Sequence, residues 1–214
     1  MFDFSGISRD GVIGQFLRLP LALIPKGMVV RVLQGKLRGY RWITSSSTHG
    51  CWLGSYELTK QCQFSEVVKE GDVVFDIGAN VGFYSLLASH CVGPTGQVQA
   101  FEPLPENLAY LEKHFRLNHC TNVSIHCVAV SDRSAKLCFQ RGGGYRSIGR
   151  LSEQGDLEVK AISLDEFVYH DGNRPPNVVK IDVETAEFHV LRGAERLLKL
   201  GYSGNFMATK AESF

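Results

Sequence analysis

The sequence predicts an α/β fold in which a mostly parallel β-sheet is wrapped by helices. From Gly71 onward, apolar runs of strand length alternate with stretches in which apolar residues recur at helical spacing, a pattern typical of parallel sheets. The first run ends at a glycine turn, as a buried parallel strand does. The 214 residues are 44% hydrophobic and 21% charged. Such a chain can bury a sizeable core, which excludes disorder, a coiled coil and a collagen-like repeat.

Residues 1–70 are expected to form an N-terminal extension that packs on a core domain of residues 71–214. The apolar stretch from Val12 to Pro25 is interrupted by polar residues and by Pro20. It is too short to span a bilayer, which needs about 20 apolar residues, and it lacks the basic start and cleavage site of a signal peptide. We expect an amphipathic helix packed on the domain, with attachment to a membrane surface as the alternative.

The remainder of the extension contains two short β-type runs and one helical pattern. The runs are Val29–Leu33 and Leu37–Thr44, joined by a turn at Gln34-Gly35. A helix is expected from Glu57 to Lys69, where apolar residues recur at helical spacing. The sequence contains no internal repeat, and no Pro/Gly/Ser-rich linker divides it into two large domains.

The core domain is expected to contain four parallel strands in chain order. Each run is apolar and bounded by turn residues, as buried strands are. Their ranges are Val73–Ile77, Gln97–Phe101, Val123–Val130 and Val178–Val183.

Helical patterns and one insertion lie between these runs. The expected helices are Phe83–Cys91, one that starts at Pro105, where proline fits a first helical turn, and Ala186–Leu200, with Phe188, Leu191, Ala194 and Leu198 on one face. The insertion before the fourth strand is expected to pair Lys136–Gln140 with Leu157–Ala161, antiparallel, around the loop Arg141–Gly155.

The net charge indicates which class of partner to expect, and the cysteines indicate the cellular compartment. The chain has 23 Lys and Arg against 22 Asp and Glu, a formal charge of +1. No global field therefore draws in nucleic acid or an anionic lipid, and we expect a small-molecule substrate. The six cysteines form no C-x-x-C pair and lie in apolar stretches. We interpret them as reduced core thiols of a cytoplasmic protein.

The strongest local motif is the run Asp76-Ile77-Gly78-Ala79-Asn80-Val81-Gly82, which follows the first strand and opens a helix. Gly78 can adopt positive φ and lets a ligand approach the backbone, and Gly82 allows close packing of helix on strand. Ligands of open α/β sheets bind at the carboxyl ends of strands, where the strand order reverses. An acid followed by a glycine turn suits a ligand with an ammonium group and a ribose. The alternative is a purely structural turn.

Two phosphate-binding patterns are missing. The dinucleotide fingerprint G-x-G-x-x-G fails because Asn80 lies between Gly78 and Gly82. This disfavours an NAD-dependent oxidoreductase, and no P-loop pattern is present either. Glu102 ends the second strand, where a carboxylate can accept both hydroxyls of a ribose. The alternative for Glu102 is an acid that only stabilises the start of the next helix.

These motifs together resemble the FkbM-type S-adenosylmethionine-dependent methyltransferases. The resemblance rests on Asp76–Gly82, Phe101-Glu102-Pro103, Val128–Asp132 and Lys180–Glu184, and upstream on Gly35–Trp42 and Leu53–Glu57. It covers residues 20 to 200. It implies a Rossmann-like class I methyltransferase sheet, S-adenosylmethionine as cofactor, and methyl transfer to a hydroxyl of a small acceptor such as a sugar unit or a secondary metabolite.

The resemblance also implies roles for individual residues of this chain. Asp76, Gly78, Asn80 and Gly82 would hold the methionine end of the cofactor, and Glu102 its ribose. The adenine would be bordered by Ala129, Ser131 and Asp132, and Glu57 of the extension would cover the cofactor from the other side. Thr185 departs from the family's glycine at that position.

The chemistry of O-methylation needs a proton acceptor for the hydroxyl. Asp182, which ends the fourth strand, is the first candidate and His49 the second, although an ordinary loop histidine is the favoured interpretation of His49. A divalent ion held by Asp182 and Glu184 is an alternative, but one pair of acids is a thin metal signal, and no metal site is expected.

We expect a different part of the chain to determine which acceptor is bound. The glycine-rich loop around Tyr145 and Arg146, together with Glu184, would contact the acceptor; its alternative is a solvated hairpin tip. A catalytically degenerate cofactor-binding module is the competing function, favoured by Thr185. The oligomeric state is left open.

The last residues are expected to give a sheet shorter than that of the full class. The family's sheet has seven strands in the order 3-2-1-4-5-7-6, but after Leu200 one weak strand pattern remains, Asn205–Thr209. We therefore expect the fourth strand, or a poor fifth, to form an open edge. The expectation is a shortened or partial member of the family.

Overall fold

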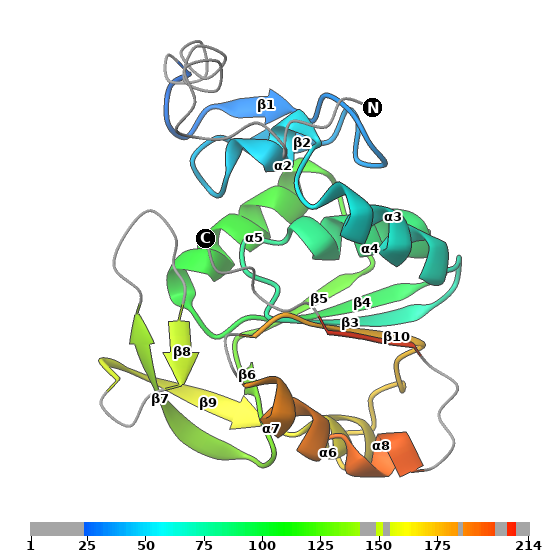
Figure 1. The fold of residues 1–214 in the computed structure, drawn as a ribbon, viewed down its shortest axis with the longest axis vertical. Coiled ribbons are helices and arrows are strands. Elements are labelled where there is room, and N and C mark those ends of the chain that lie inside the picture. The colour runs from blue at the N-terminus through cyan, green and yellow to red at the C-terminus, as the bar shows by residue number, and fades with distance from the viewer. Residues whose placement is uncertain (1–23, 142–148, 152–154, 184–185, 200–204, 209–214) are drawn as a thin grey trace.

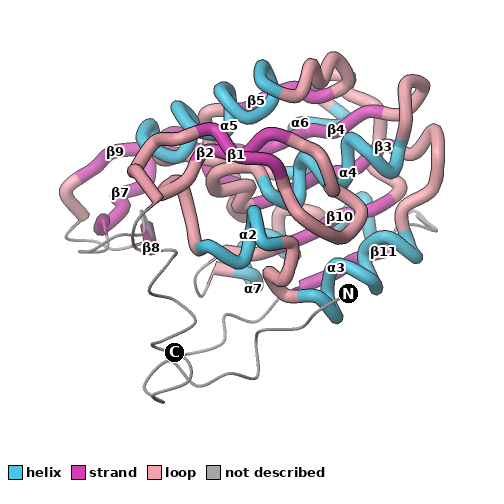
Figure 2. The backbone as a smooth tube through the Cα atoms, turned by 90° about the horizontal axis from the view of Figure 1, so that it is seen from above, coloured by secondary structure: helices cyan, strands magenta, loops and turns pink. Residues whose placement is uncertain are grey.

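The computed structural model describes residues 24–141, 149–151, 155–183, 186–199 and 205–208. Among these, a parallel five-stranded sheet forms the centre, in the order β11-β10-β3-β4-β5, seen edge-on in Figure 1 and from above in Figure 2. Its strands are β3 (Val73–Ile77), β4 (Gln97–Phe101), β5 (Val123–His126), β10 (Val178–Ile181) and β11 (Asn205–Ala208). Most of the expected 12–25 helix lies outside the described residues, as do Tyr145, Arg146, Glu184 and Thr185.

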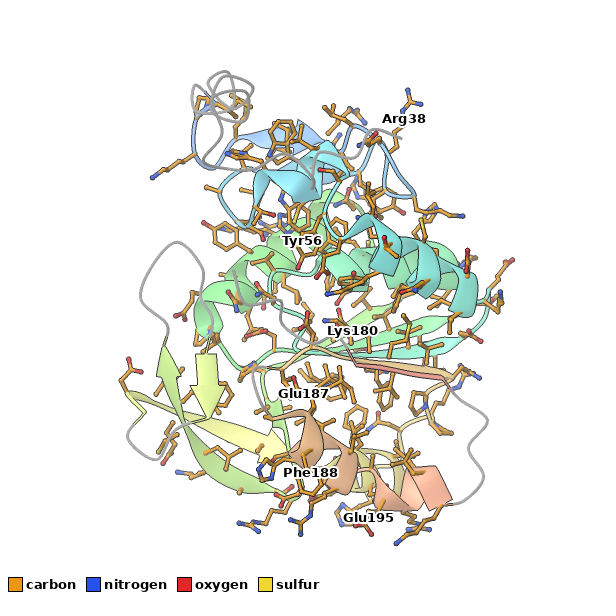
Figure 3. The ribbon with its side chains drawn as sticks, in the orientation of Figure 1. Arg38, Tyr56, Lys180, Glu187, Phe188 and Glu195 are labelled. Atoms are coloured by element: carbon orange, nitrogen blue, oxygen red, sulfur yellow. The ribbon has the colours of Figure 1, made fainter. Side chains whose placement is uncertain are left out.

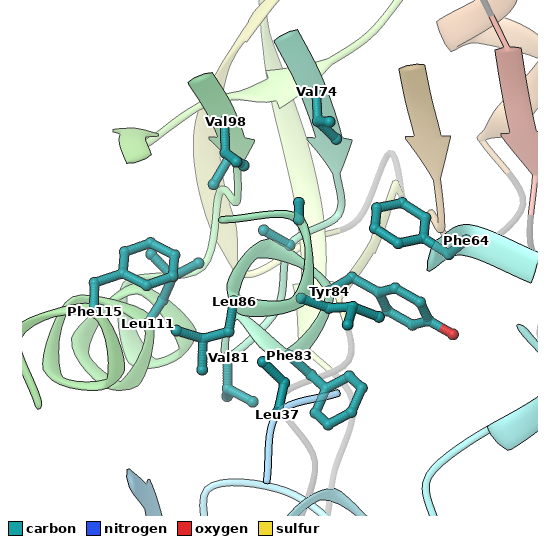
Figure 4. Packing of buried hydrophobic residues seen from close by; sticks show 14 of the residues in the cluster. Leu37, Phe64, Val74, Val81, Phe83, Tyr84, Leu86, Val98, Leu111 and Phe115 are labelled. Atoms are coloured by element: carbon teal, nitrogen blue, oxygen red, sulfur yellow. The ribbon is translucent and has the colours of Figure 1, made fainter. Parts of the chain in front are cut away.

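Helices cover both faces of the sheet, so the expected α/β architecture is confirmed. On one face lie α3 (Leu58–Val67), α4 (Phe83–Val92) and α5 (Pro105–Leu117); on the other lie α6 (Leu164–Tyr169), α7 (Glu187–Arg192) and α8 (Glu195–Lys199). Alternation along β3 explains this: Val73, Phe75 and Ile77 join one apolar cluster and Val74 the other. The cluster around α4 is drawn in Figure 4.

The N-terminal extension forms a cap over the helices α4 and α5. It contains the antiparallel strands β1 (Val29–Arg31) and β2 (Arg41–Ile43) and the short helix α2 (His49–Leu53). The fully buried Trp42 of β2 stacks on His114 of α5, with ring centroids 3.9 Å apart. The imidazole of His114 accepts a hydrogen bond from the Ile43 amide (3.1 Å) and donates one to the carbonyl of Val81 (2.8 Å). His114 therefore joins the extension to the loop that follows β3.

This arrangement predicts a loss of stability in acid. Burial lowers the pKa of His114 to about 4 from an ordinary 6.5, so below pH 6.5 the unfolded state binds more protons than the folded state. The free energy of unfolding should have its highest value, as far as His114 is concerned, above about pH 6.5. It should fall by about 3 kcal/mol as the pH decreases to about 4. Urea denaturation at a series of pH values measures this. His114→Gln should flatten the dependence, and His170→Gln, at an exposed position, should not; identical slopes in all three proteins would contradict the account.

The run 123–130, expected to be one strand, is divided between two sheets. Val123–His126 forms β5 of the central sheet, and Ala129–Val130 forms β6 of a second sheet. The break falls at the exposed Cys127. The second sheet has the order β6-β9-β7-β8 and contains β7 (Ala135–Arg141), β8 (Gly149–Leu151) and β9 (Leu157–Ile162). The expected antiparallel pairing of the insertion is confirmed, because β7 pairs with β9.

The helix expected over 186–200 differs in both continuity and buried face. It is divided into α7 and α8 around Gly193, where an added Cβ would lie 2.0 Å from the carbonyl oxygen of Ser131. Of the apolar face expected there, only Ala194 is buried: Phe188 is 67% exposed, and Leu191 and Leu198 are also exposed. The other buried residues are Val190 and Leu197, which were not in the expected set.

The last strand and the cysteines differ in how well they match the expectations. The weak fifth strand is present as β11, which pairs parallel with β10 at the edge of the described sheet. All six cysteines are free, but Cys62, Cys127 and Cys138 are exposed rather than in the core; Cys138, for example, alternates with the buried Phe139 along β7. In the part of the chain that the structure describes, no helix is long and apolar enough to cross a membrane.

Candidate cofactor site

The candidate site lies at the point where the strand order reverses, between β3 and β10. The chain runs from β3 outward to β4 and β5, then returns to β10 on the other side of β3. The carboxyl ends of β3 and β10 are joined by the Asp182 amide, which donates to the carbonyl of Ile77 at 2.9 Å. Ligands of open α/β sheets bind at such a switch point.

The backbone of the loop after β3 requires glycine at its first position. Gly78 has φ +76°, and a Cβ there would lie 2.1 Å from the carbonyl oxygen of Asp182. A side chain at residue 78 would therefore separate the two strand ends. Gly82 has φ +92° and packs against Leu111 and Phe115 of α5, so its small size serves helix–helix contact rather than the helix–strand contact that we expected.

Glu102 holds this loop from the end of β4. Its carboxylate accepts hydrogen bonds from the Asn80 amide (2.8 Å), the Leu104 amide (3.0 Å) and the Asn107 side chain (3.1 Å). Burial to 4% exposure raises the pKa of Glu102, and these three donors act in the opposite direction. A carboxylate offers about four lone-pair positions, so one position on Oε2 is left to accept a ligand hydroxyl.

Lys180 is the central residue of the site, and the sequence reasoning gave it no role. Its ammonium group lies 2.9 Å from Asp76 Oδ1 and 3.7 Å from Asp182 Oδ2, and it donates to the carbonyl of Gly78 at 3.1 Å. Burial opposes the charge of Lys180, but the carboxylates of Asp76 and Asp182 outweigh it and raise the pKa of Lys180. Figure 3 shows Lys180 between the sheet and the helical layer above it. The lysine therefore links both strand ends and the glycine loop.

Asp76 and Asp182 differ in what they can reach. Asp76 is fully buried, and its second oxygen accepts a hydrogen bond from Ser85 at 2.5 Å. Direct contact of this carboxylate with a ligand ammonium does not fit that geometry, so Asp76 serves to hold Lys180. The Asp182 side chain is 32% exposed. Of the two acids bound to Lys180, Asp182 is the one that a ligand can approach.

Glu57 connects the extension to the same region. Its carboxylate accepts a hydrogen bond from the Tyr84 hydroxyl at 3.0 Å and pairs with Lys60 at 2.7 Å. The ring of Tyr84 lies under the Lys180 ammonium, 5.2 Å away, and burial together with Glu57 raises the pKa of Tyr84. Glu57 has a φ of +44°, uncommon for a non-glycine residue. Tyr84 therefore connects Glu57 to Lys180, and the expected role of Glu57 over the cofactor stays a prediction.

The residues expected around the adenine lie on β6 and directly after it. Ala129 is buried in a cluster with Leu104, whose amide binds Glu102. Ser131 is buried and its amide donates to the carbonyl of Ile162, and Asp132 lies 3.7 Å from His189 of α7. The described contacts therefore connect Ala129 to the Glu102 region and Asp132 to α7, and the role of all three at the adenine stays a prediction.

His49 is not brought to the strand ends by any contact that the structure describes. It is exposed on α2, and its Nδ1 accepts a hydrogen bond from the indole of Trp52 at 3.2 Å. The acceptor-side residues Tyr145, Arg146 and Glu184 lie outside the described residues. Within the described part, no group of three or more metal-ligating side chains is found. Asp182 is thus the candidate base with a described place in the site.

The parallel sheet, with a glycine loop and an acid at the ends of the neighbouring strands β3 and β4, is the Rossmann-like arrangement that class I methyltransferases have. Residues 76–200 match the family model of the methyltransferase FkbM domain. Because the match covers more than half of the chain, the chain belongs to this family. The resemblance drawn from the sequence motifs is confirmed.

Curated relatives are similar over part of their lengths. The hexuronic acid methyltransferase AglP of Haloferax volcanii is 30% identical over 135 residues, which are 63% of this chain and 54% of that protein. The 31-O-demethyl-FK506 methyltransferase FkbM of Streptomyces tacrolimicus is 29% identical over 173 residues, 64% of this chain and 66% of that protein. The chain thus spans between about half and two thirds of these relatives.

Among solved structures, a methyltransferase FkbM from Methylobacillus flagellatus is similar with a TM-score of 0.46 and 15% identity. The similarity covers 72% of this chain and 43% of that one.

Proposed function

We propose that this chain binds S-adenosylmethionine at the β3–β10 switch point and transfers its methyl group to a hydroxyl oxygen of a small acceptor. The observation that carries the proposal is the convergence of the Gly78 loop, Glu102 and Asp182 at the carboxyl ends of β3, β4 and β10. Family membership supports the reaction class. The two relatives named as a hexuronic acid methyltransferase and a 31-O-demethyl-FK506 methyltransferase support a hydroxylated acceptor.

The residues present fit the cofactor at three places. Glu102 has an acceptor position for a ribose hydroxyl, the apolar cluster of Ala129 and Leu104 adjoins it for the adenine, and the glycine loop allows the methionine end to approach the backbone. The cofactor supplies an electrophilic methyl group on a sulfonium, and the protein supplies orientation.

Asp182 is the residue that we assign to the acceptor. Its partly exposed carboxylate would accept the hydrogen bond of the acceptor hydroxyl and would take its proton when the methyl group is transferred. Lys180, 3.7 Å away, holds that carboxylate in place and is in turn held by Asp76. Lys180 is therefore a positioning residue.

Titration with S-adenosylhomocysteine tests the cofactor assignment. Hydrogen bonds to charged groups contribute about 1.5–3 kcal/mol, so Glu102→Ala should weaken binding about tenfold or more. Because the same carboxylate binds two backbone amides, thermal unfolding should be measured alongside, and Glu102→Gln serves as the variant that keeps shape and one acceptor oxygen. Equal affinity in wild type and in a folded Glu102→Ala variant would remove Glu102 from the ribose site.

A further inference from the structure

The N-terminal hairpin, defined here as residues 24–44, carries positive charge without balancing acids. From Ile24 to Tyr56 the chain contains no Asp and no Glu, although its overall charge is only +1. This segment therefore carries a net positive charge, and it lies at one end of the molecule, in the cap shown at the top of Figure 1. The basic residues of the hairpin are Lys26, Arg31, Lys36, Arg38 and Arg41.

Two of these arginines lie directly opposite each other. Arg31 of β1 is the register partner of Arg41 of β2, and both are exposed. Like charges directly opposite on a strand pair are destabilising. The Arg31 guanidinium donates to the carbonyl of Gly39 at 3.0 Å, and neither arginine forms an ion pair with another residue of the described ranges. An anion beside the pair would relieve this repulsion.

The same region contains a shallow depression. It has a volume of about 460 Å³ and is lined by Arg38, Tyr40, Arg41, Asn118 and His119, among others. Figure 3 shows Arg38 projecting away from the body of the molecule. The depression therefore offers guanidinium donors to an anionic group that approaches from solvent.

Large apolar side chains are exposed beside these cations. Met28 is 44% exposed, Val29 46% and Leu33 57%. Val29 and Arg31 lie on the same side of β1, because strand residues two apart point the same way. Exposed aliphatic side chains grouped on a short segment mark an interaction surface rather than scattered surface residues.

We propose that the N-terminal hairpin docks the protein on the surface of a membrane that contains anionic lipids. The arginines match the negative lipid headgroups, and Met28, Val29 and Leu33 enter the boundary between headgroups and acyl chains. A nucleic acid would satisfy the arginines equally well, but it would leave the three aliphatic side chains in water. The combination of both residue types on one hairpin therefore selects the membrane.

Co-sedimentation of the full chain with lipid vesicles tests the proposal. The vesicles consist of phosphatidylcholine alone, or of phosphatidylcholine with about one quarter phosphatidylglycerol. We expect binding to the anionic vesicles only, weakened as the salt concentration rises. The double variant Arg31→Gln/Arg41→Gln should lower the partition coefficient about thirtyfold, and Val29→Ser/Leu33→Ser should lower it at least tenfold.

Matched control variants distinguish binding through the hairpin from nonspecific adsorption to the vesicles. Phe188→Ser removes an exposed apolar side chain of α7, and Lys136→Gln/Lys199→Gln removes two exposed charges elsewhere; both should bind as wild type does. Equal binding to neutral vesicles, unchanged binding of the hairpin variants, or binding to a single-stranded RNA oligonucleotide without binding to anionic vesicles would each overturn the proposal. The methyl-transfer assay is not involved, so the outcome is independent of the proposed function.

Discussion

Replacing Asp182 by Asn is expected to lower kcat for methyl transfer by about 10²–10⁴, the range of general base catalysis. The carboxylate lies at the end of β10, is 32% exposed and is held 3.7 Å from the Lys180 ammonium. Asn keeps the size of the side chain and one acceptor oxygen but cannot take the proton. Affinity for S-adenosylhomocysteine should hardly change, because the cofactor contacts come from the Gly78 loop and Glu102.

The measurement is a steady-state comparison of purified variants, with cofactor affinity determined on the same samples. Asp171→Asn, which alters an acid paired with the exposed His170, is the control and should keep full activity. Full activity of the Asp182 variant would move the role to another residue, and His49 would be tested next. Activity that is lost with a chelator and restored by Mg²⁺ would assign the hydroxyl's activation to a metal ion.

The second large effect concerns stability. Lys180→Met should lower the free energy of unfolding by about 3–5 kcal/mol, because it leaves the Asp76 carboxylate buried without its counter-charge. Both side chains are almost completely buried, at 3% and 0% exposure, and lie 2.9 Å apart. Methionine fills a similar volume, so an empty cavity contributes little.

Urea denaturation of a double-mutant cycle measures this effect. Asp76→Asn combined with Lys180→Met removes both charges, so the double variant should lose less stability than the sum of the single losses. Lys136→Met is the matched control. Its pair with Glu158 is shorter, at 2.7 Å, but the two side chains are 69% and 58% exposed, so its loss should lower the free energy of unfolding much less than the loss of Lys180 does. Additive losses, or equal losses for Lys180 and Lys136, would contradict a coupled buried pair.

The central strands could be predicted residue by residue. Val73–Ile77 and Gln97–Phe101 were expected with the bounds that the structure shows, because each is a short apolar run between turn residues. The run 123–130 could not be divided from its pattern alone, since both pieces are β-strands and only their hydrogen-bond partners differ. Partner choice is a tertiary property.

The helix after β10 shows why a buried face is harder to predict. Two sets of apolar residues follow helical spacing there, one with Phe188 and Leu191 and one with Val190 and Leu197. The break at Gly193, which packs against the carbonyl of Ser131, decides which set turns inward. α6 was not predicted at all, although Ser163 caps it by accepting a hydrogen bond from the Glu166 amide.

The candidate site was predictable at its loop and strand ends but not in its ion pairs. A lysine in an apolar run gives no signal by itself, so Lys180 received no role. A signal did exist: Asp76 and Lys180 each interrupt a buried strand with one charge, and the structure places them as register partners on β3 and β10. Opposite charges within two runs that become neighbouring strands predict a buried pair.

Transfer of a radiolabelled methyl group from S-adenosylmethionine to a panel of hydroxylated acceptors, with hexuronic acids and their glycosides included, tests the central claim most directly. With the wild type, we expect the label in at least one acceptor, as a methyl ether of one of its hydroxyl groups. With Asp182→Asn, we expect the rate of transfer to be lower by about 10²–10⁴. Cofactor binding without transfer to any acceptor above the Asp182→Asn level would contradict catalysis by this site and would favour a cofactor-binding module that does not turn over.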